Sequence, residues 1–173
     1  MASGNVLKHI PPQDFIPESS GPTGGEYGLV YDGLLKGLSF PAGVSTGAVV
    51  AFRLPDTASL STGATVKLLV ADDPNNPMVS KNVVLGVNFG KLGTTSAYVA
   101  PATAALGTEA TATVTLPSTS GQTIEVSIPI VAANMASCAA SAYCLMRVRR
   151  LGASTSDTGT GRLLLLGATV TDT

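Results

Sequence analysis

The sequence has few aromatic and few charged residues, and it has no tryptophan. Aromatic residues make up 5% of the 173 residues. Charged residues make up 12%, about half the share of an ordinary globular protein, and the net charge is −1. A partner bound through its phosphates requires clustered lysine and arginine, so this balance argues against a nucleic-acid partner. A sparsely charged surface also suggests that copies of the chain or another protein cover part of it.

Histidine and cysteine are scarce as well. The one histidine, His9, lies in a proline-rich stretch. A Ser-His-Asp triad or a histidine metal site needs a rigid histidine, so we expect His9 on the surface. Cys138 and Cys144 could pair only across a tight turn, because six residues of strand span about 20 Å; we expect buried, reduced thiols. With no visible acid–base pair, the sequence predicts no enzymatic activity and no cofactor.

Long apolar runs are also missing. No segment approaches the roughly 18 unbroken apolar residues of a membrane helix, and the first residues lack the layout of a signal peptide. We therefore expect no membrane partner and no passage through the general secretory route. Residues 72–77 (Asp-Asp-Pro-Asn-Asn-Pro) offer oxygen ligands for calcium, but their prolines favour an ordinary turn. Arg147 and Arg149 share a strand face and could contact an acidic partner, although a salt-bridged sheet face is the expected arrangement.

Apolar and polar residues alternate over much of the sequence. A period of two is typical of strands with one buried face. The expected strands span residues 27–32, 34–40, 49–54, 64–71, 81–91, 111–116, 123–130, 143–151 and 162–172. No amphipathic helix lies between them, so the sheets should be antiparallel. We predict an all-β fold, an antiparallel β-sandwich of jelly-roll type over residues 26–173, with an extended N-terminal arm over residues 1–25.

The same alternation assigns the core. Its expected members are Phe52, Val66, Leu68, Val87, Val114, Ile124, Val126, Ile128, Val148 and Leu166. The last strand is apolar on both faces, because Leu163 and Leu165 lie opposite Leu164 and Leu166. Such a strand must meet a second layer, either loops of its own chain or another subunit. Leu163 and Leu165 are therefore candidate contacts with a partner.

The arm contains four prolines, which exclude a helix or a central strand. It also carries five large apolar side chains, too many for a solubilising tail: Val6, Leu7, Ile10, Phe15 and Ile16. They either pack back on their own domain or lie on a neighbouring subunit. In the second case they are partner-binding residues, and deletion of residues 2–20 should leave the sandwich folded.

Several strand successions look familiar. They are Val50–Asp56, Gly63–Leu68, Asn82–Val87, Leu145–Leu151 and Leu163–Val170. Over roughly residues 26 to 173, the chain resembles small structural proteins of tailed bacteriophages, of the capsid-decoration (cement) or head-fibre type. The resemblance rests on the pattern of the strands and on their general composition, and it does not extend to the arm.

This resemblance implies a compact β-domain, often a homotrimer, that binds the major capsid protein on the outside of a phage head. The expected location is the capsid exterior of the virion, with assembly in the host cytoplasm. The family supplies no catalytic residues. An alternative is a receptor- or glycan-binding module of a tail fibre or baseplate, which would share the sandwich. It ranks second because glycan sites usually display tryptophan or tyrosine platforms, and the chain has no tryptophan and four tyrosines. A small hydrolase ranks below both.

Overall fold

The computed structural model describes residues 4–18, 29–32, 35–92 and 106–173; for residues 29–32, 35 and 36 only the backbone is described. The strands are β1 (Val6–Ile10), β2 (Ile16–Pro17), β3 (Leu29–Asp32), β4 (Leu35–Phe40), β5 (Ser45–Arg53), β6 (Gly63–Asp72), β7 (Asn82–Lys91), β8 (Ala110–Thr115), β9 (Thr123–Val131), β10 (Tyr143–Leu151) and β11 (Leu163–Asp172). Two short 3-10 helices are η1 (Pro12–Asp14) and η2 (Ala132–Asn134). Every expected strand is present; residues 27, 28 and 34, where two of them were expected to begin, lie outside the described residues.

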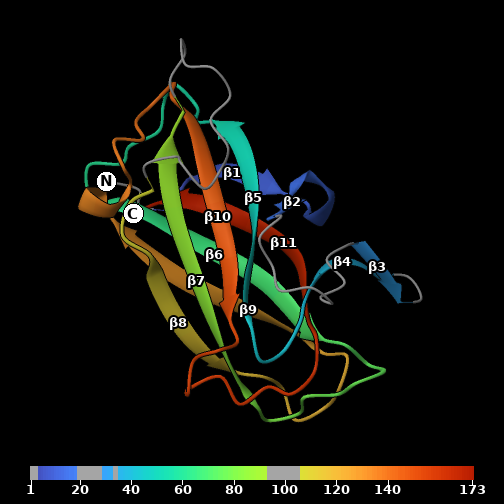
Figure 1. Ribbon diagram of the computed structural model, residues 1–173. Helices are drawn as coiled ribbons and strands as arrows, with labels where there is room; N and C mark the ends of the chain where they lie inside the picture. Colours follow the sequence, from blue (N-terminus) through green and yellow to red (C-terminus); the bar gives the residue numbers. More distant parts are fainter. Residues whose placement is uncertain (1–3, 19–28, 33–34, 93–105) are drawn as a thin grey trace.

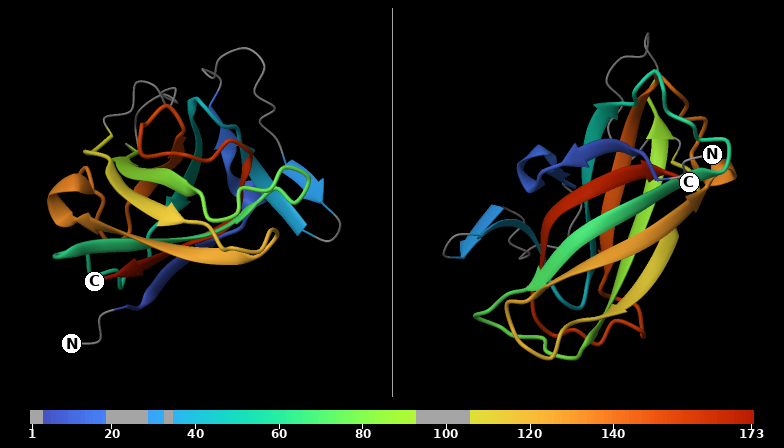
Figure 2. Two further views of the ribbon diagram at one scale, coloured as in Figure 1. Left: turned by 90° about the horizontal axis from the view of Figure 1, so that it is seen from below. Right: turned by 180° about the vertical axis from the view of Figure 1, so that it is seen from behind.

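The strands form two antiparallel sheets packed face to face (Figure 1). The six-stranded sheet runs in the order β3-β4-β11-β6-β9, with β1 also paired to β11. The five-stranded sheet runs in the order β2-β5-β10-β7-β8. Seen from behind, β11, β6 and β9 lie side by side across the other strands (Figure 2). The predicted fold class, an all-β antiparallel sandwich of jelly-roll type, is confirmed.

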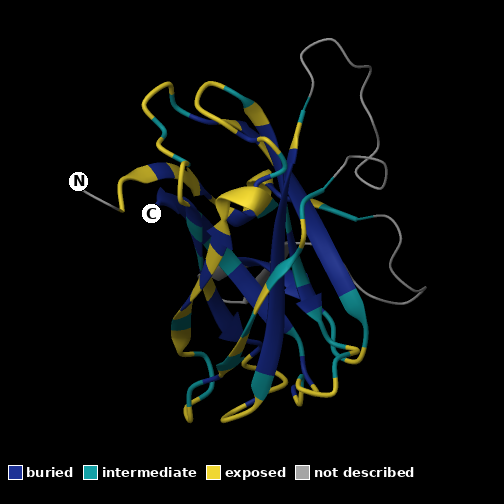
Figure 3. Cartoon of the chain, turned by 90° about the vertical axis from the view of Figure 1, so that its left-hand side faces the viewer, coloured by how far each residue is buried: buried dark blue, intermediate teal, exposed yellow. Residues whose placement is uncertain are grey.

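The core lies between the two sheets, where the inward side chains of each strand have almost no exposed surface. On β6, for example, Val66, Leu68 and Val70 are fully buried while Lys67 and Leu69 between them face outward. The central strands are buried along most of their length, whereas exposed residues gather in the loops and on the edges (Figure 3). Of the ten expected core residues seven are buried, and Val114 and Ile124 on the edge strands β8 and β9 are partly buried against the core.

Leu166 is the exception, because β11 contains a bulge. Leu165 pairs with Val70 and Gly167 pairs with Leu69, so Leu166 is one extra residue on β11. A bulge of one residue shifts the alternation of every side chain that follows it. The inward residues are therefore Leu163 and Leu165 before the bulge and Ala168 and Val170 after it. The prediction of Leu166 as a core residue is wrong for this reason.

The described part of the N-terminal arm belongs to both sheets. β1 pairs antiparallel with β11, and β2 pairs antiparallel with β5. β1 contains no proline, and the prolines around it fall in η1 and at the sheet edge, where a missing N–H costs least. The arm therefore joins an edge of one sheet to an edge of the other. No helix among the described residues is long and apolar enough to cross a membrane.

Candidate functional site

The residues predicted to bind a partner divide into buried and exposed groups. Leu163 and Leu165 have no exposed surface and face the core, so in this fold they cannot touch a partner. That prediction is corrected: the layer that covers them is the opposite sheet of their own chain. In the arm, Leu7, Ile10 and Phe15 are buried in the same core.

The remaining two arm residues, Val6 and Ile16, are exposed at 51% and 62%. The described arm therefore packs back on its own domain, which was the first of the two expected arrangements. Of the seven residues predicted to bind a partner, these two keep apolar surface that a partner could cover.

A carboxylate fixes the start of the arm. Asp172 Oδ1, near the end of β11, accepts hydrogen bonds from the backbone N–H groups of Gly4 at 3.0 Å and Asn5 at 2.7 Å. The Asn5 side-chain amide donates to Asp172 Oδ2 at 3.3 Å. Hydrogen bonds to an ionised acceptor are among the stronger ones in proteins. They set the register in which β1 adds to the sheet.

Charged and amide side chains line the outer face of the five-stranded sheet. We call this set the polar face; its members are Glu18, Asn88, Glu109, Arg147 and Arg149. Arg147 Nε donates to Asn88 Oδ1 at 3.1 Å, and Arg147 Nη1 lies 3.5 Å from Glu18 Oε1. Arg149 Nη1 lies 3.4 Å from both Glu109 carboxylate oxygens. The expected salt-bridged sheet face is confirmed for both arginines.

The ion pairs of the polar face are half-buried, with side-chain exposures between 18% and 26%. Two glycines make room for them. Arg149 pairs with Gly47 on one neighbouring strand and with Gly86 on the other. A Cβ on Gly47 would overlap the Glu18 carboxylate, and one on Gly86 would lie 2.7 Å from the Glu109 Cδ. The two carboxylates thus lie over backbone on either side of Arg149.

An exposed tyrosine lies on the same side of β10. Tyr143 is 51% exposed and pairs with Arg53 of β5. Arg53 Nη2 donates to Asp56 Oδ1 at 2.8 Å, and the Ser141 hydroxyl donates to the same oxygen at 2.6 Å. The Ser141 hydrogen bond and the neighbouring Arg53 charge lower the pKa of Asp56 below its ordinary value of 3.8. The end of the sheet next to Tyr143 is therefore bordered by charged and polar side chains.

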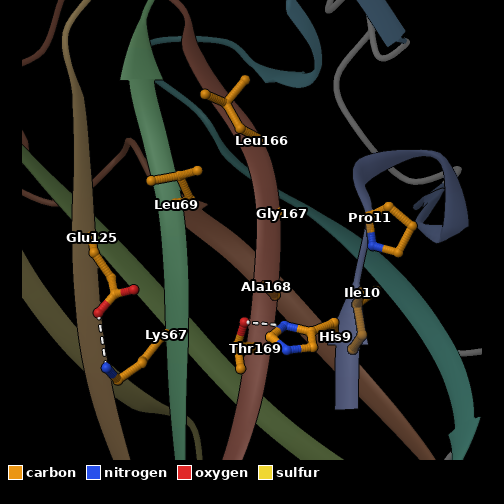
Figure 4. A pocket seen from close by; sticks show the side chains of 10 residues that line it. All are labelled: His9, Ile10, Pro11, Lys67, Leu69, Glu125, Leu166, Gly167, Ala168 and Thr169. Atoms are coloured by element: carbon orange, nitrogen blue, oxygen red, sulfur yellow. Dashed lines mark hydrogen bonds and ion pairs between the residues drawn. The ribbon is translucent and has the colours of Figure 1, made fainter. Parts of the chain in front are cut away.

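The outer face of the six-stranded sheet carries a shallow groove of about 330 Å³ (Figure 4). Its floor contains Leu69 and the bulged Leu166, and two polar pairs border it. His9 Nδ1 lies 3.0 Å from Thr169 Oγ1, and Lys67 Nζ lies 3.0 Å from Glu125 Oε1. His9 is exposed, as expected from the sequence. The groove contains one exposed ion pair, whereas the polar face contains two half-buried ones, so we take the polar face as the candidate site.

A buried ion pair was missed by the sequence analysis. Arg150 and Asp157 both have side chains without exposed surface, and Arg150 Nη2 lies 2.8 Å from Asp157 Oδ1. The same guanidinium donates to the carbonyl oxygens of Gly159 and Gly161, both at 2.6 Å. A signal was present, because alternation along β10 puts Arg150 on the inward face of Cys144, Met146 and Val148. This pair stabilises the loop before β11 and is not a binding site.

Residues 72–77 form a turn in which the carboxylates are already used. Asp72 accepts from the Met78 N–H at 3.0 Å, from the Ser120 hydroxyl at 3.0 Å and from the Gly121 N–H at 2.7 Å. Asp73 Oδ1 accepts from the Asn75 N–H at 2.9 Å. No group of three or more metal-ligating side chains occurs among the described residues. The turn therefore has a structural role.

Comparison with known proteins gives likeness of fold. No family model matches the chain, and no curated protein matches it significantly. A xylan-binding module of family CBM15 superposes with a TM-score of 0.55 and 18% identity over 98% of this chain and 97% of that one. A CBM22 xylan-binding domain from Paenibacillus barcinonensis gives a TM-score of 0.52 and 9% identity over 99% and 97%. A family 11 carbohydrate-binding module from Clostridium thermocellum, in complex with a β-1,3-1,4-mixed-linked tetrasaccharide, gives a TM-score of 0.51 and 10% identity over 98% of this chain and 96% of that one.

These superpositions cover nearly the whole of each chain. The shared feature is the two-sheet sandwich. At such low identity the likeness extends to the fold and not to individual side chains. None of the three structures is named as a virion protein.

Proposed function

We propose that the protein is a non-catalytic binding module and that its ligand is a glycan bound on the polar face. The observation that carries the proposal is the half-buried row of arginine, glutamate and asparagine side chains across one sheet. Guanidinium, amide and carboxylate groups are planar and form hydrogen bonds in pairs, which matches the adjacent hydroxyl groups of a sugar ring. Two arginines face two glutamates, so the polar face suits an uncharged ligand better than an anionic one.

Tyr143 supplies an apolar surface on the same face. It lies four residues before Arg147 on β10, about 13 Å along the strand. An exposed aromatic ring can pack against the apolar side of a sugar while its hydroxyl group remains in water. A chain of sugars lying along β10 would then contact the Tyr143 ring at one end and the polar face at the other.

The fold likeness supports the proposal. Two of the compared structures are named for binding xylan, and the third contains a bound tetrasaccharide. The same sandwich architecture therefore presents glycan sites in those proteins. For this chain the ligand class follows from the chemistry of the polar face together with that likeness.

The placement of the carboxylates supports binding without hydrolysis. Glu109 faces the Arg149 guanidinium and Glu18 faces that of Arg147. Glycoside hydrolysis requires a pair of carboxyl groups of which one keeps its proton to protonate the leaving oxygen. Here each carboxylate faces a guanidinium, an arrangement that fits the non-catalytic binding proposed.

The test is binding of the full chain to a panel of soluble neutral polysaccharides, including xylan and mixed-linked β-glucan, by affinity electrophoresis and calorimetry. Arg147→Gln should weaken binding at least tenfold, because loss of a charged hydrogen bond costs about 1.5–3 kcal/mol and each 1.4 kcal/mol is about tenfold in affinity. Lys67→Gln is the matched control, since Lys67 also forms an ion pair but on the opposite sheet. Absence of binding to every neutral glycan, or an equal loss in the control, would contradict the proposal.

We propose capsid decoration as a second candidate function, favoured by a different observation. Val6 and Ile16 expose apolar surface on an arm whose other large apolar residues are buried. With the sequence resemblance to cement proteins, this suggests that the two side chains contact the major capsid protein or a second copy in a homotrimer on the capsid exterior. Apolar residues exposed on a short edge strand are a suitable surface for such a contact.

Sedimentation with undecorated phage heads tests this second candidate. The double variant Val6→Ser/Ile16→Ser should lower occupancy on the heads. Val131→Ser is the control, because Val131 is 57% exposed on β9, which β6 and β11 separate from β1. Light scattering of the free protein measures whether a trimer forms without the capsid. Failure of the unmodified chain to bind any head would remove this candidate and leave glycan binding untouched.

A further inference from the structure

Cys138 lies in the tight loop between η2 and β10, and Cys144 is the second residue of β10. Cys138 is 6% exposed and Cys144 is fully buried, and both belong to the core between the sheets. Turns at 135–138 and 139–142 reverse the chain, with the Cys138 N–H donating to the Met135 carbonyl at 2.9 Å. The earlier expectation depended on whether a tight turn separates the cysteines, and the structure shows that it does.

The backbone of this loop is unusual. Four non-glycine residues with positive φ occur in the described chain, and three of them are in this loop: Ala136 (φ 47°), Ser137 (φ 63°) and Ser141 (φ 63°). Left-handed conformations of non-glycine residues are uncommon and each costs free energy. Here they belong to the turns that reverse the chain between Cys138 and Cys144. Ser141 N–H also donates to the Pro55 carbonyl at 3.3 Å, which fixes the loop on the turn after β5.

The two thiols are in hydrogen-bond contact, and the contact makes them chemically unequal. The hydrogen bond from Cys144 lowers the pKa of Cys138; burial opposes this, and the charge of Lys91 contributes a smaller lowering. The same hydrogen bond and burial raise the pKa of Cys144. Cys138 has the greater exposure and is therefore the thiol that an oxidant reaches first; the thiolate is the reactive form of cysteine.

We propose that Cys138 and Cys144 form an intramolecular disulfide when the protein meets an oxidising small-molecule disulfide such as oxidised glutathione. The Cys138 thiolate attacks one sulfur of the oxidant, forming a mixed disulfide and releasing one glutathione thiol. Cys144 then loses its proton and attacks the Cys138 sulfur, and the second glutathione leaves. Two protein thiols are oxidised and one glutathione disulfide is reduced to two thiols, so atoms and electrons balance.

The bond would close a short loop that already reverses between the two cysteines. Its consequence is local, because the loop carries Ser141, which contacts Asp56, and leads directly into Tyr143. A disulfide there restricts opening of the loop and of the first residues of β10. The inference stands on the geometry of the loop and does not depend on the ligand of the polar face.

The test is incubation of the folded, reduced protein with oxidised glutathione, followed by thiol titration and intact mass measurement. The expected result is loss of both free thiols at the mass of one chain less two hydrogens, with Tm raised by several degrees. Cys144→Ser should instead stop at the glutathione adduct on Cys138. Cys138→Ser should react far more slowly, because the buried Cys144 thiol alone remains.

Two outcomes would overturn the proposal. One is that the folded chain keeps both thiols while the same chain in urea is oxidised, which would mean that the loop prevents the bond. The other is a disulfide-linked dimer on a non-reducing gel, which would mean that the thiols meet a second chain before they meet each other.

Discussion

Removing the Asp157 carboxylate should destabilise the fold strongly. The carboxylate accepts from Arg150 Nε at 3.0 Å and from Arg150 Nη2 at 2.8 Å, and neither side chain is exposed. In Asp157→Ala the carbonyls of Gly159 and Gly161 would still accept from the guanidinium, but its charge would be buried without a counter-ion. Breaking a buried ion pair in this way costs about 3–5 kcal/mol, against a total stability of about 5–15 kcal/mol for a typical domain.

Urea and thermal unfolding measure this cost. At about 2–4 °C per kcal/mol for a chain of this size, Tm should fall by roughly 6–20 °C. Glu125→Ala is the matched control, because it removes the carboxylate of the exposed Lys67–Glu125 pair, and exposed pairs contribute about 0–1 kcal/mol. The double variant Arg150→Met/Asp157→Ala removes the buried charge and should recover part of the loss, while the hydrogen bonds of Asp157 with Val84 N–H and Gly159 N–H stay lost. If Asp157→Ala is no less stable than Glu125→Ala, the reasoning is refuted.

Three further predictions test the bulge, the arm and the polar turn beside Tyr143. Leu165→Ala should cost about 2–5 kcal/mol in urea unfolding and Leu166→Ala clearly less; the opposite order would mean that β11 has no bulge. Deletion of residues 2–18 should lower Tm by many degrees, because three core side chains are lost; an unchanged Tm would mean that the arm is not part of the core. Ser141→Ala should raise the pKa of Asp56 toward 3.8 in a carboxyl NMR titration. Because the pKa of Asp56 is lower in the folded state, its carboxylate stabilises the fold above pH 3.8, and this stabilisation is lost as the pH falls through the folded pKa. The pH-dependent part of the stability should therefore be smaller in Ser141→Ala.

Alternation predicted the strands well because each strand of this sandwich has one buried face. The pattern is reliable only while the register is unbroken, and the bulge at Leu166 breaks it once. Leu163–Leu166 are four leucines in a row, so the sequence there contains no polar residue to show which side faces out. The same ambiguity made Leu163 and Leu165 look like contacts for a partner.

Arg150 shows a signal that could have been used. An arginine on the inward face of a strand must meet a counter-ion or several carbonyl oxygens, since a buried unpaired charge is too costly. The loop after β10 offers Asp157 seven residues later, close enough to fold back on it. The polar face is different, because its pairs join residues 129 and 40 positions apart in sequence. Those contacts depend on which strands are neighbours, and a single sequence does not contain the strand order.

The prolines of the arm correctly excluded a helix and a central strand, but they did not predict that the arm forms two edge strands. They exclude a central strand, but an edge strand tolerates them, and β1 itself has none. The five apolar side chains of the arm could not be divided into core and surface from the sequence alone. That division depends on β1 adding to β11 and β2 adding to β5, which places Leu7 inside and Ile16 outside.

The arm also links the fold to the candidate site. Glu18 follows β2 directly, donates its N–H to the Gly47 carbonyl at 3.0 Å, and places its carboxylate beside Arg147. An arm deletion would therefore remove core side chains and one member of the polar face together. Such a truncation cannot separate a role in binding from a role in folding. Substitutions at the exposed Val6 and Ile16 can, because they leave both the core and Glu18 in place.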